Sequence, residues 1–154
     1  MKPTSPVIAR RRILIGATGA AALLTQFAAG RAGATPETAK ALLQTLAKGE
    51  PKEGRISIRA PEIAENGNAV PVTVSVESPM TDKDHVKAIH VVADGNPNPG
   101  VASFMLTPLS GKAEVQIRVR MASTQKIVAV AQMADGSLWT AAREIKVTIG
   151  GCGG

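Results

Sequence analysis

Cysteine and aromatic residues are almost absent from this sequence. It contains one cysteine, one tryptophan, two phenylalanines and no tyrosine. A single cysteine excludes an internal disulfide, a C-x-x-C redox motif and the C-x-x-C-H attachment site of haem. The aromatic side chains are too few for a stacking platform on single-stranded nucleic acid. Glycine-rich phosphate-binding motifs such as a P-loop are also missing.

Side chains that could support acid–base or metal chemistry are scarce as well. His85 and His90 are the only histidines. Their odd separation in one extended segment places the imidazoles on opposite faces, so we expect no shared metal site. Four carboxylates of the central region form no acid and base pair and are interpreted as surface charges: Glu62, Glu65, Asp82 and Asp84. We therefore expect no catalytic residue, no metal and no cofactor.

The N-terminal segment has the features of a cleaved export signal. Arg10 and Arg11 precede a mildly apolar stretch at residues 15–24, and an A-x-A sequence ends at Ala34. This order is typical of a twin-arginine signal peptide, here residues 1–34 with cleavage after Ala34. The signal predicts a periplasmic protein.

Two other interpretations of this N-terminus are disfavoured. A membrane anchor needs about 20 consecutive strongly apolar residues, whereas this stretch is shorter, rich in Gly and Ala, and broken by Arg31. The net charge of +6 could suggest nucleic acid as a partner, but five of the 18 basic residues and none of the 12 acidic residues lie in residues 1–34. The remaining 13 basic and 12 acidic residues give a net charge of +1, so we expect no nucleic-acid binding.

Residues 35–53 predict a short helix followed by a linker. Thr35, Pro36 and Glu37 supply an N-cap hydroxyl, a proline at the first helical position and an acid in the first turn. Apolar residues then recur at helical spacing: Ala39, Leu42, Leu43 and Leu46. This stripe is typical of a surface that faces the core or a partner, and Lys48-Gly49 supplies a stop.

Residues 54–149 predict a β-sandwich, because the apolar period changes from 3.6 to 2. Turn signals separate seven expected strands, at residues 55–60, 70–77, 86–93, 101–107, 115–121, 126–133 and 138–149. Pro71 lacks an N–H and predicts an edge strand or an irregular start. The fold class is therefore all-β: an immunoglobulin-like antiparallel sandwich without the inter-sheet disulfide.

Cys152, the only cysteine, lies in a segment of four glycines: Gly150, Gly151, Gly153 and Gly154. Glycine adopts positive φ as readily as negative, so we expect residues 150–154 to form a flexible arm with an exposed thiol. At about 3.6 Å per extended residue, the sulfur could lie about 10 Å beyond the last strand. The arm holds no base or cation that would activate the thiol. Long reach without activation favours a covalent group carrier over an enzyme.

Two other functions are compatible with an exported sandwich that carries one thiol. The first is an interaction protein that uses Cys152 only for an intermolecular disulfide, for example a Cys152–Cys152 bond between two copies. This function leaves the flanking glycines unexplained. The second is a redox or metal-delivery module, but soft metals usually recruit several ligands, and the arm contains no Met or His.

Three segments together carry a resemblance to a known family. They are the terminal GGCGG with the preceding residues 147–149, the run at residues 61–80, and the twin-arginine leader. These segments resemble the SoxY family, the sulfur carriers of bacterial thiosulfate oxidation. The resemblance implies that Cys152 is the covalent attachment point for sulfur intermediates and that the glycines form its swinging arm.

The resemblance also implies a set of partners. The chain would form a complex with SoxZ, a second small β-sandwich protein, and the two would be exported together. SoxAX, a c-type cytochrome, would conjugate thiosulfate to Cys152, and the hydrolase SoxB would release sulfate. Where a sulfur dehydrogenase, SoxCD, is present, it would oxidise the remaining sulfane sulfur.

Overall fold

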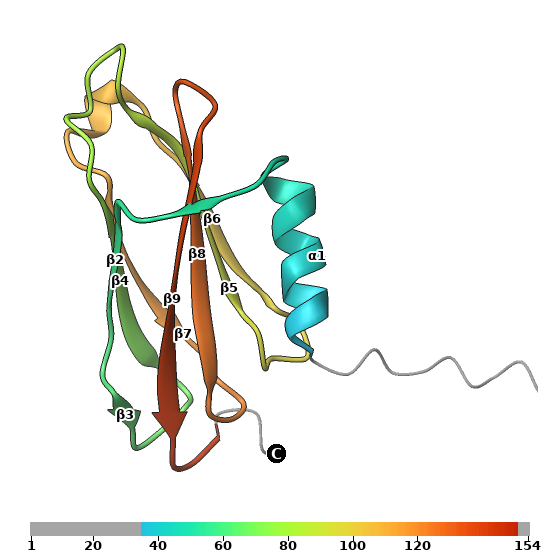
Figure 1. Cartoon of the computed structure of the whole chain (residues 1–154). Helices are drawn as coiled ribbons and strands as arrows, with labels where there is room; N and C mark the ends of the chain where they lie inside the picture. The colour runs from blue at the N-terminus through green and yellow to red at the C-terminus, as the bar shows by residue number, and fades with distance from the viewer. Residues whose placement is uncertain (1–34, 151–154) are drawn as a thin grey trace, which may run out of the picture. The chain divides into compact units, whose positions relative to one another are not determined.

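The computed structural model describes residues 35–150, which form one helix, nine strands and a short 3-10 helix (Figure 1). The elements are α1 (Pro36–Leu46), β1 (Lys52–Glu53), β2 (Ile56–Arg59), β3 (Ile63–Ala64), β4 (Val70–Val76), β5 (Val86–Ala93), β6 (Gly100–Met105), η1 (Pro108–Ser110), β7 (Glu114–Val119), β8 (Gln125–Met133) and β9 (Leu138–Val147).

The strands form two sheets that pack against each other. The larger sheet has the order β1-β9-β8-β5-β6, with β3 also paired to β9, and the smaller sheet has the order β2-β4-β7. Apart from β1 and β3, which run parallel to β9, neighbouring strands are antiparallel. The predicted fold class, an all-β sandwich preceded by a short helix, is confirmed.

All seven predicted strands occur, with shifts at their ends. The strand at 86–93 has the predicted bounds, while β6 and β7 each end two residues earlier than predicted. The sequence pattern does not predict β1 and β3. Each contains two residues and pairs with the outer side of β9, and two residues are too short to show a period of 2.

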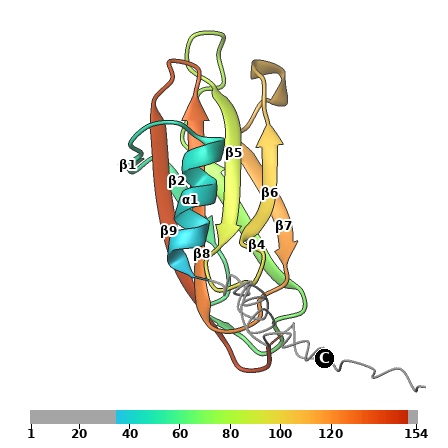
Figure 2. The same ribbon diagram turned by 90° about the vertical axis from the view of Figure 1, so that its right-hand side faces the viewer.

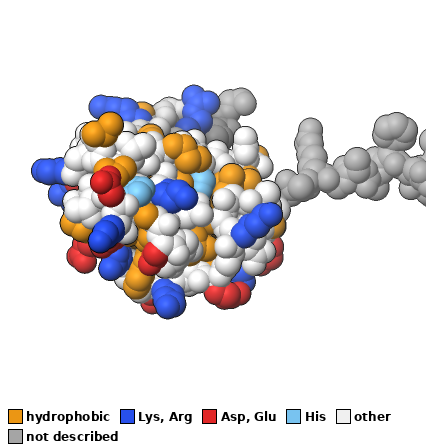
Figure 3. All heavy atoms as spheres, turned by 90° about the horizontal axis from the view of Figure 1, so that it is seen from above, with side chains coloured by type: hydrophobic (Ala, Val, Ile, Leu, Met, Phe, Trp, Pro, Cys, Tyr) orange, Lys and Arg blue, Asp and Glu red, His pale blue; other side chains and the backbone are white. Residues whose placement is uncertain are grey.

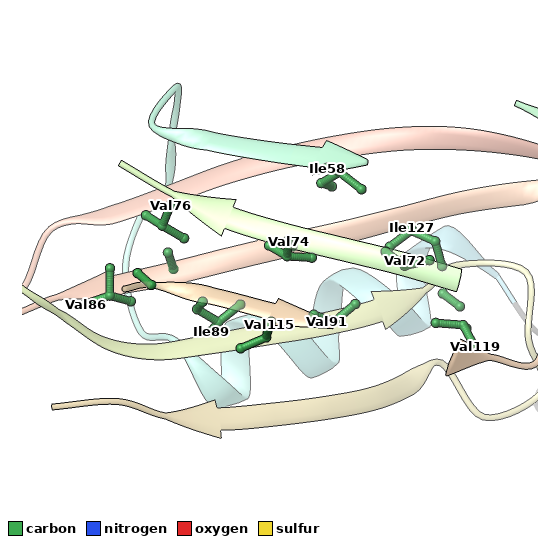
Figure 4. Packing of buried hydrophobic residues seen from close by; sticks show 14 of the residues in the cluster. Ile58, Val72, Val74, Val76, Val86, Ile89, Val91, Val115, Val119 and Ile127 are labelled. Carbon is green, nitrogen blue, oxygen red and sulfur yellow. The ribbon is translucent and has the colours of Figure 1, made fainter. Parts of the chain in front are cut away.

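The core between the sheets is built mainly from aliphatic side chains (Figure 4). The burial of β4 alternates along the strand, with the even-numbered valines inside: Val70, Val72, Val74 and Val76. They face Ile89 and Val91 of β5 and Ile127 of β8, all of them essentially inaccessible to solvent. Burial of this apolar surface supplies the main driving force for folding.

Pro71 lies in the central strand of the smaller sheet, so the prediction of an edge strand is wrong for β4 as a whole. Its pairing with β2 nevertheless stops where Arg59 lies opposite Thr73. The N–H of Glu77 donates to Arg55, and that of Val76 donates to Ala113 beside β7. Odd-numbered residues of β4 therefore point their N–H groups toward β2. The backbone nitrogen of Pro71 therefore faces past the end of β2. No β2 carbonyl lies there to need an N–H donor, so proline is tolerated.

Helix α1 covers the outer face of the larger sheet (Figure 2). Thr35 caps it, since its Oγ1 accepts from the Thr38 N–H at 3.3 Å and the Thr38 hydroxyl accepts from the Thr35 N–H at 3.3 Å. Leu43 and Ala47 pack against Val130 and Leu138 of β8 and β9, which accounts for the burial of β8 on both faces. No helix within residues 35–150 is long and apolar enough to cross a membrane.

Candidate functional site

Most of the predicted site residues lie outside the part of the chain that the structure describes. Arg10, Arg11 and Ala34 belong to residues 1–34, and three glycines and the cysteine of the arm belong to residues 151–154. Within the described residues the site is therefore the root of the arm, Gly150, together with the segments that surround it.

The last residues before the arm are hydrogen-bonded on two sides by a structure that we call the collar, residues 64–67 and 121–124. On one side, the Thr148 N–H donates to the Ala64 carbonyl at 3.1 Å, and the Gly67 N–H donates to the Ile149 carbonyl at 2.7 Å. On the other side, the Val147 N–H donates to Thr124 Oγ1 at 2.9 Å. These bonds hold residues 147–149 to two loops far away in sequence.

The two parts of the collar are also joined to each other. The Met121 N–H donates to the Gly67 carbonyl at 2.8 Å, and Gly67 is buried. The Thr148 hydroxyl adds a further bond to the Glu65 carbonyl at 2.9 Å. The chain thus reaches Gly150 through a closed set of hydrogen bonds, at the end of the sandwich where β3 lies and β9 finishes (Figure 1).

This arrangement corrects the prediction that the last strand continues to Ile149. Strand β9 ends at Val147. Its pairing with β8 stops at Ile145, opposite Gln125, and its pairing with β3 stops at Val147, opposite Ala64. Ile145 is fully buried, whereas Ile149 is 67% exposed. Ile149 therefore does not continue the core face of the strand, and its carbonyl bonds to the collar instead.

Gly150 packs directly against the collar. A Cβ atom on Gly150 would overlap the Ala122 carbonyl oxygen and lie 3.1 Å from the Ala122 carbonyl carbon. Its φ lies outside the left-handed region, unlike that of Gly49, Gly54, Gly111 or Gly136. Close approach of two backbones, rather than positive φ, is thus what requires glycine at this position.

Two amide side chains support the collar, and the sequence reasoning missed both. Asn96 lies in the β5–β6 connection, which the sequence predicts only as a turn. Gln125 begins β8, one residue before the predicted start of that strand. Gln125 shares the inward-facing register of Ile127 and Ala129 and is 5% exposed. A polar residue in phase with a buried apolar series is the signal that could have revealed it.

The two histidines lie in different environments. His85 precedes β5, with Nδ1 3.0 Å from the Thr81 carbonyl oxygen. His90 lies in the middle of β5, 3% exposed, with Nδ1 2.8 Å from the hydroxyl of Ser103. Burial lowers the pKa of His90 because the charged form is poorly solvated there. Residues 35–150 contain no group of three or more His, Cys, Asp or Glu side chains that could hold a metal ion.

Two ion pairs join charged side chains on the surface of residues 35–150. Arg59 contacts Glu114 at 2.8 Å, and Arg55 lies 3.5 Å from Asp84. A hydrogen bond from Ser75 and the nearby Arg59 charge lower the pKa of Glu114. Viewed from the end where β8 joins β9, basic and acidic side chains are interspersed rather than gathered by sign (Figure 3). Within residues 35–150, this view shows no extended basic surface.

Comparison with known families gives a match over most of the chain. Residues 39–152 match the family described as sulfur oxidation protein SoxY. The chain belongs to the SoxY family. The match extends through the arm to Cys152, so the resemblance read from the sequence is confirmed at the level of the family.

A solved SoxY structure agrees with this assignment. The sulfur carrier protein SoxY from Chlorobium limicola f thiosulfatophilum is 39% identical, with a TM-score of 0.63 over 75% of this chain and 100% of that chain. A comparison with curated proteins gave no significant match.

More distant structures share the fold only. The superoxide reductase (neelaredoxin) from Ignicoccus hospitalis is 23% identical, with a TM-score of 0.54 over 75% of this chain and 94% of that chain. A putative superoxide reductase from Thermotoga maritima is 23% identical, with a TM-score of 0.52 over 64% of this chain and 87% of that chain. These likenesses place the SoxY family chain among similar β-sandwiches and carry no argument about its chemistry.

Proposed function

We propose that this chain is a periplasmic sulfur carrier that holds thiosulfate-derived intermediates on the Cys152 thiol and presents them to the enzymes of the Sox pathway. One observation carries the proposal: the only cysteine of a SoxY family chain lies between two pairs of glycines. The relative from Chlorobium limicola is described as a sulfur carrier, which supports the same role here.

The carrier chemistry is an oxidation followed by a hydrolysis. In the first step, the Cys152 thiol and thiosulfate form a sulfur–sulfur bond, giving Cys–S–S–SO₃⁻ and releasing one proton and two electrons, which SoxAX accepts. In the second step, SoxB adds water and cleaves the bond between the sulfane sulfur and the sulfonate. Sulfate, the cysteine persulfide anion Cys–S–S⁻ and two protons are the products. Where SoxCD is present, it would oxidise the persulfide, and a second hydrolysis would restore the thiol.

The described residues suit a carrier that leaves the chemistry to its partners. The side chains whose hydrogen bonds hold the 121–124 part of the collar are those of Asn96, Gln125 and Thr124. None of them is a base or a cation that could activate a thiol. Activation of Cys152 would therefore come from the enzyme that receives the arm, and this chain supplies attachment and placement.

Intact-mass analysis of the protein from thiosulfate-grown cells tests the proposal. We expect sulfonate and persulfide adducts on the wild-type chain, and none on Cys152→Ser, which cannot form a sulfur–sulfur bond. A wild-type chain isolated only as the free thiol or as a Cys152–Cys152 dimer would contradict the proposal and favour the interaction protein that uses its cysteine for a disulfide.

Export with SoxZ follows from the twin-arginine signal and can be tested separately. Replacing Arg10 and Arg11 by lysine should keep both proteins in the cytoplasm, since this route carries folded cargo. Fractionation followed by immunodetection of each protein measures the outcome. SoxZ at its normal periplasmic level in the variant strain would show that it does not depend on this chain for export.

A further inference from the structure

Gln125 is a buried polar side chain whose whole amide is bonded. Its Oε1 accepts from the Gly95 N–H at 2.8 Å, and its Nε2 donates to Asn96 Oδ1 at 2.9 Å and to the Ser123 carbonyl at 3.1 Å. The cost of burying this amide is therefore offset by partners on both of its polar atoms. All three partners lie in the loops next to the arm root.

Asn96 extends these bonds to the collar. Its Oδ1 accepts from the Ala122 N–H at 3.0 Å, and its Nδ2 donates to the Arg120 carbonyl at 2.7 Å. The two amides thus bind the 120–125 loop at Arg120, Ala122 and Ser123. Ala122 is the residue whose carbonyl contacts Gly150, so a single residue joins the amide pair to the root of the arm.

The same loop is enclosed by two glycines. A Cβ on Gly95 would lie 2.9 Å from the Gln125 Cβ, and a Cβ on Gly150 would overlap the Ala122 carbonyl oxygen. Neither glycine has a φ in the left-handed region. Glycine is thus required on each side by close packing, against the Gln125 side chain at Gly95 and against the Ala122 backbone at Gly150.

The pairing of strand β8 does not require an amide at position 125. Strand β8 is held by its ladders to β5 and β9, and an apolar side chain in the same register would be buried without needing partners. A fully bonded polar group instead selects one geometry, because displacement of the loop would leave buried donors and acceptors unpaired.

We propose that Asn96 and Gln125 are positioning residues that set the point and direction from which the arm leaves the sandwich. This inference rests on the proposed carrier function for its effect on loading. It concerns only residues within 35–150. The amide pair holds Ala122, Ala122 holds Gly150, and Gly150 begins the arm.

The test compares Gln125→Met with Gln132→Met. Methionine keeps the length and removes every hydrogen bond, and Gln132 is a half-buried glutamine at the other end of the same strand. Spin labels on Cys152 and on Lys87→Cys, an exposed site on β5, report the distance distribution of the arm. Loading of Cys152 with thiosulfate by SoxAX and alkylation by iodoacetamide are measured on unlabelled protein without the Lys87 substitution.

We expect Gln125→Met to broaden the distance distribution and to slow loading about ten-fold, since misplacing a reacting group by about 1 Å can cost up to ~100-fold. Alkylation by the small reagent should stay within about two-fold, because it needs no defined approach. Gln132→Met should match the wild type in every measurement. An unchanged distance distribution in Gln125→Met, whatever its loading rate, would overturn the proposal.

Two further experiments keep the test decisive. If Gln125→Met does not fold, Asn96→Ala against Asn98→Ala, an exposed asparagine of the same connection, tests the same bonds with the same readouts. If SoxAX does not load the wild-type chain, the carrier function fails. The spin-label distances then still decide whether the amide pair positions the arm.

Discussion

The two ends of the sandwich both contain glycines, but for different physical reasons. At the hairpin end, between β8 and β9, Gly136 has a φ of 85°, and a Cβ on it would meet nothing within 4 Å. At the collar end, Gly95 and Gly150 have no such φ, yet a Cβ on either would be pressed against neighbouring atoms. Conformational freedom requires glycine at the first end, and close packing requires it at the second.

The difference reflects how each end is organised. The tip of the hairpin is closed by local bonds, because Asp135 Oδ1 accepts from the N–H and the hydroxyl of Ser137 two residues away, at 2.8 and 2.7 Å. The collar end joins segments that are distant in sequence, as in the bond from Thr148 to Glu65, 83 residues apart. A substitution in a local turn alters the structure of that turn alone. A substitution in the collar also alters the position of the arm root.

The largest expected effect comes from moving the thiol from one end to the other. Leu109 of η1 is 98% exposed, so Cys152→Ser/Leu109→Cys should fold as the wild type does and react with iodoacetamide. We expect no loading by SoxAX, because the new thiol lies on no arm. Intact mass after incubation with SoxAX and thiosulfate measures this. A sulfonate adduct on the relocated cysteine would show that exposure is sufficient and that the collar end has no special role.

Gly150→Ala and Gly136→Ala test the two roles of glycine directly. Overpacking against Ala122 should cost Gly150→Ala about 1–3 kcal/mol of unfolding free energy and also slow loading of Cys152. Gly136→Ala should cost about 1–2 kcal/mol, through its positive φ, with loading unchanged. Urea unfolding and the SoxAX loading rate measure the two effects. Equal loading by both variants would contradict the distinction between the ends.

His90 lies between the two ends and should affect stability without affecting loading. Burial lowers its pKa below the ordinary value of 6.5, so the unfolded chain takes up a proton at a higher pH than the folded protein. The unfolding free energy should be undiminished above about pH 6.5 and should fall as the pH drops through 6.5 toward the lower folded-state pKa. His90→Gln should remove this part of the pH dependence in urea unfolding. An unaltered profile would show that His90 is not its source.

The smallest expected effect concerns the cap of α1. Thr35→Ala removes the hydroxyl that accepts from the Thr38 N–H and should lower the unfolding free energy by about 1 kcal/mol. Thr45→Ala, an exposed position in the same helix, is the matched control and should change it less. Loading should be unchanged in both, since α1 packs on the outer face of the larger sheet. Slower loading by Thr35→Ala would extend the supporting structure of the arm to the helix.

Local patterns predicted most of the secondary structure. The valines of β4 alternate in the sequence as they do in burial, and the cap at Thr35 and the hairpin at Asp135 depend on neighbours within three residues. Pro71 shows the limit of this reasoning. Its missing N–H predicts a position without a hydrogen-bond partner on a neighbouring strand. Only the length of β2 shows that such a position can occur within a central strand.

The sequence by itself determined the sandwich and the short helix, because both rest on spacing along the chain. Its motifs also carried the SoxY resemblance, which implies that Cys152 is the attachment point. The tertiary structure decided how the arm root is held. Asn96, Gln125 and Ala122 have no pattern that relates them to Gly150, and the end of β9 depends on how far its partners β8 and β3 extend. Contacts between distant segments form only when the sheets pack, so this part of the site could not be predicted from neighbours in the chain.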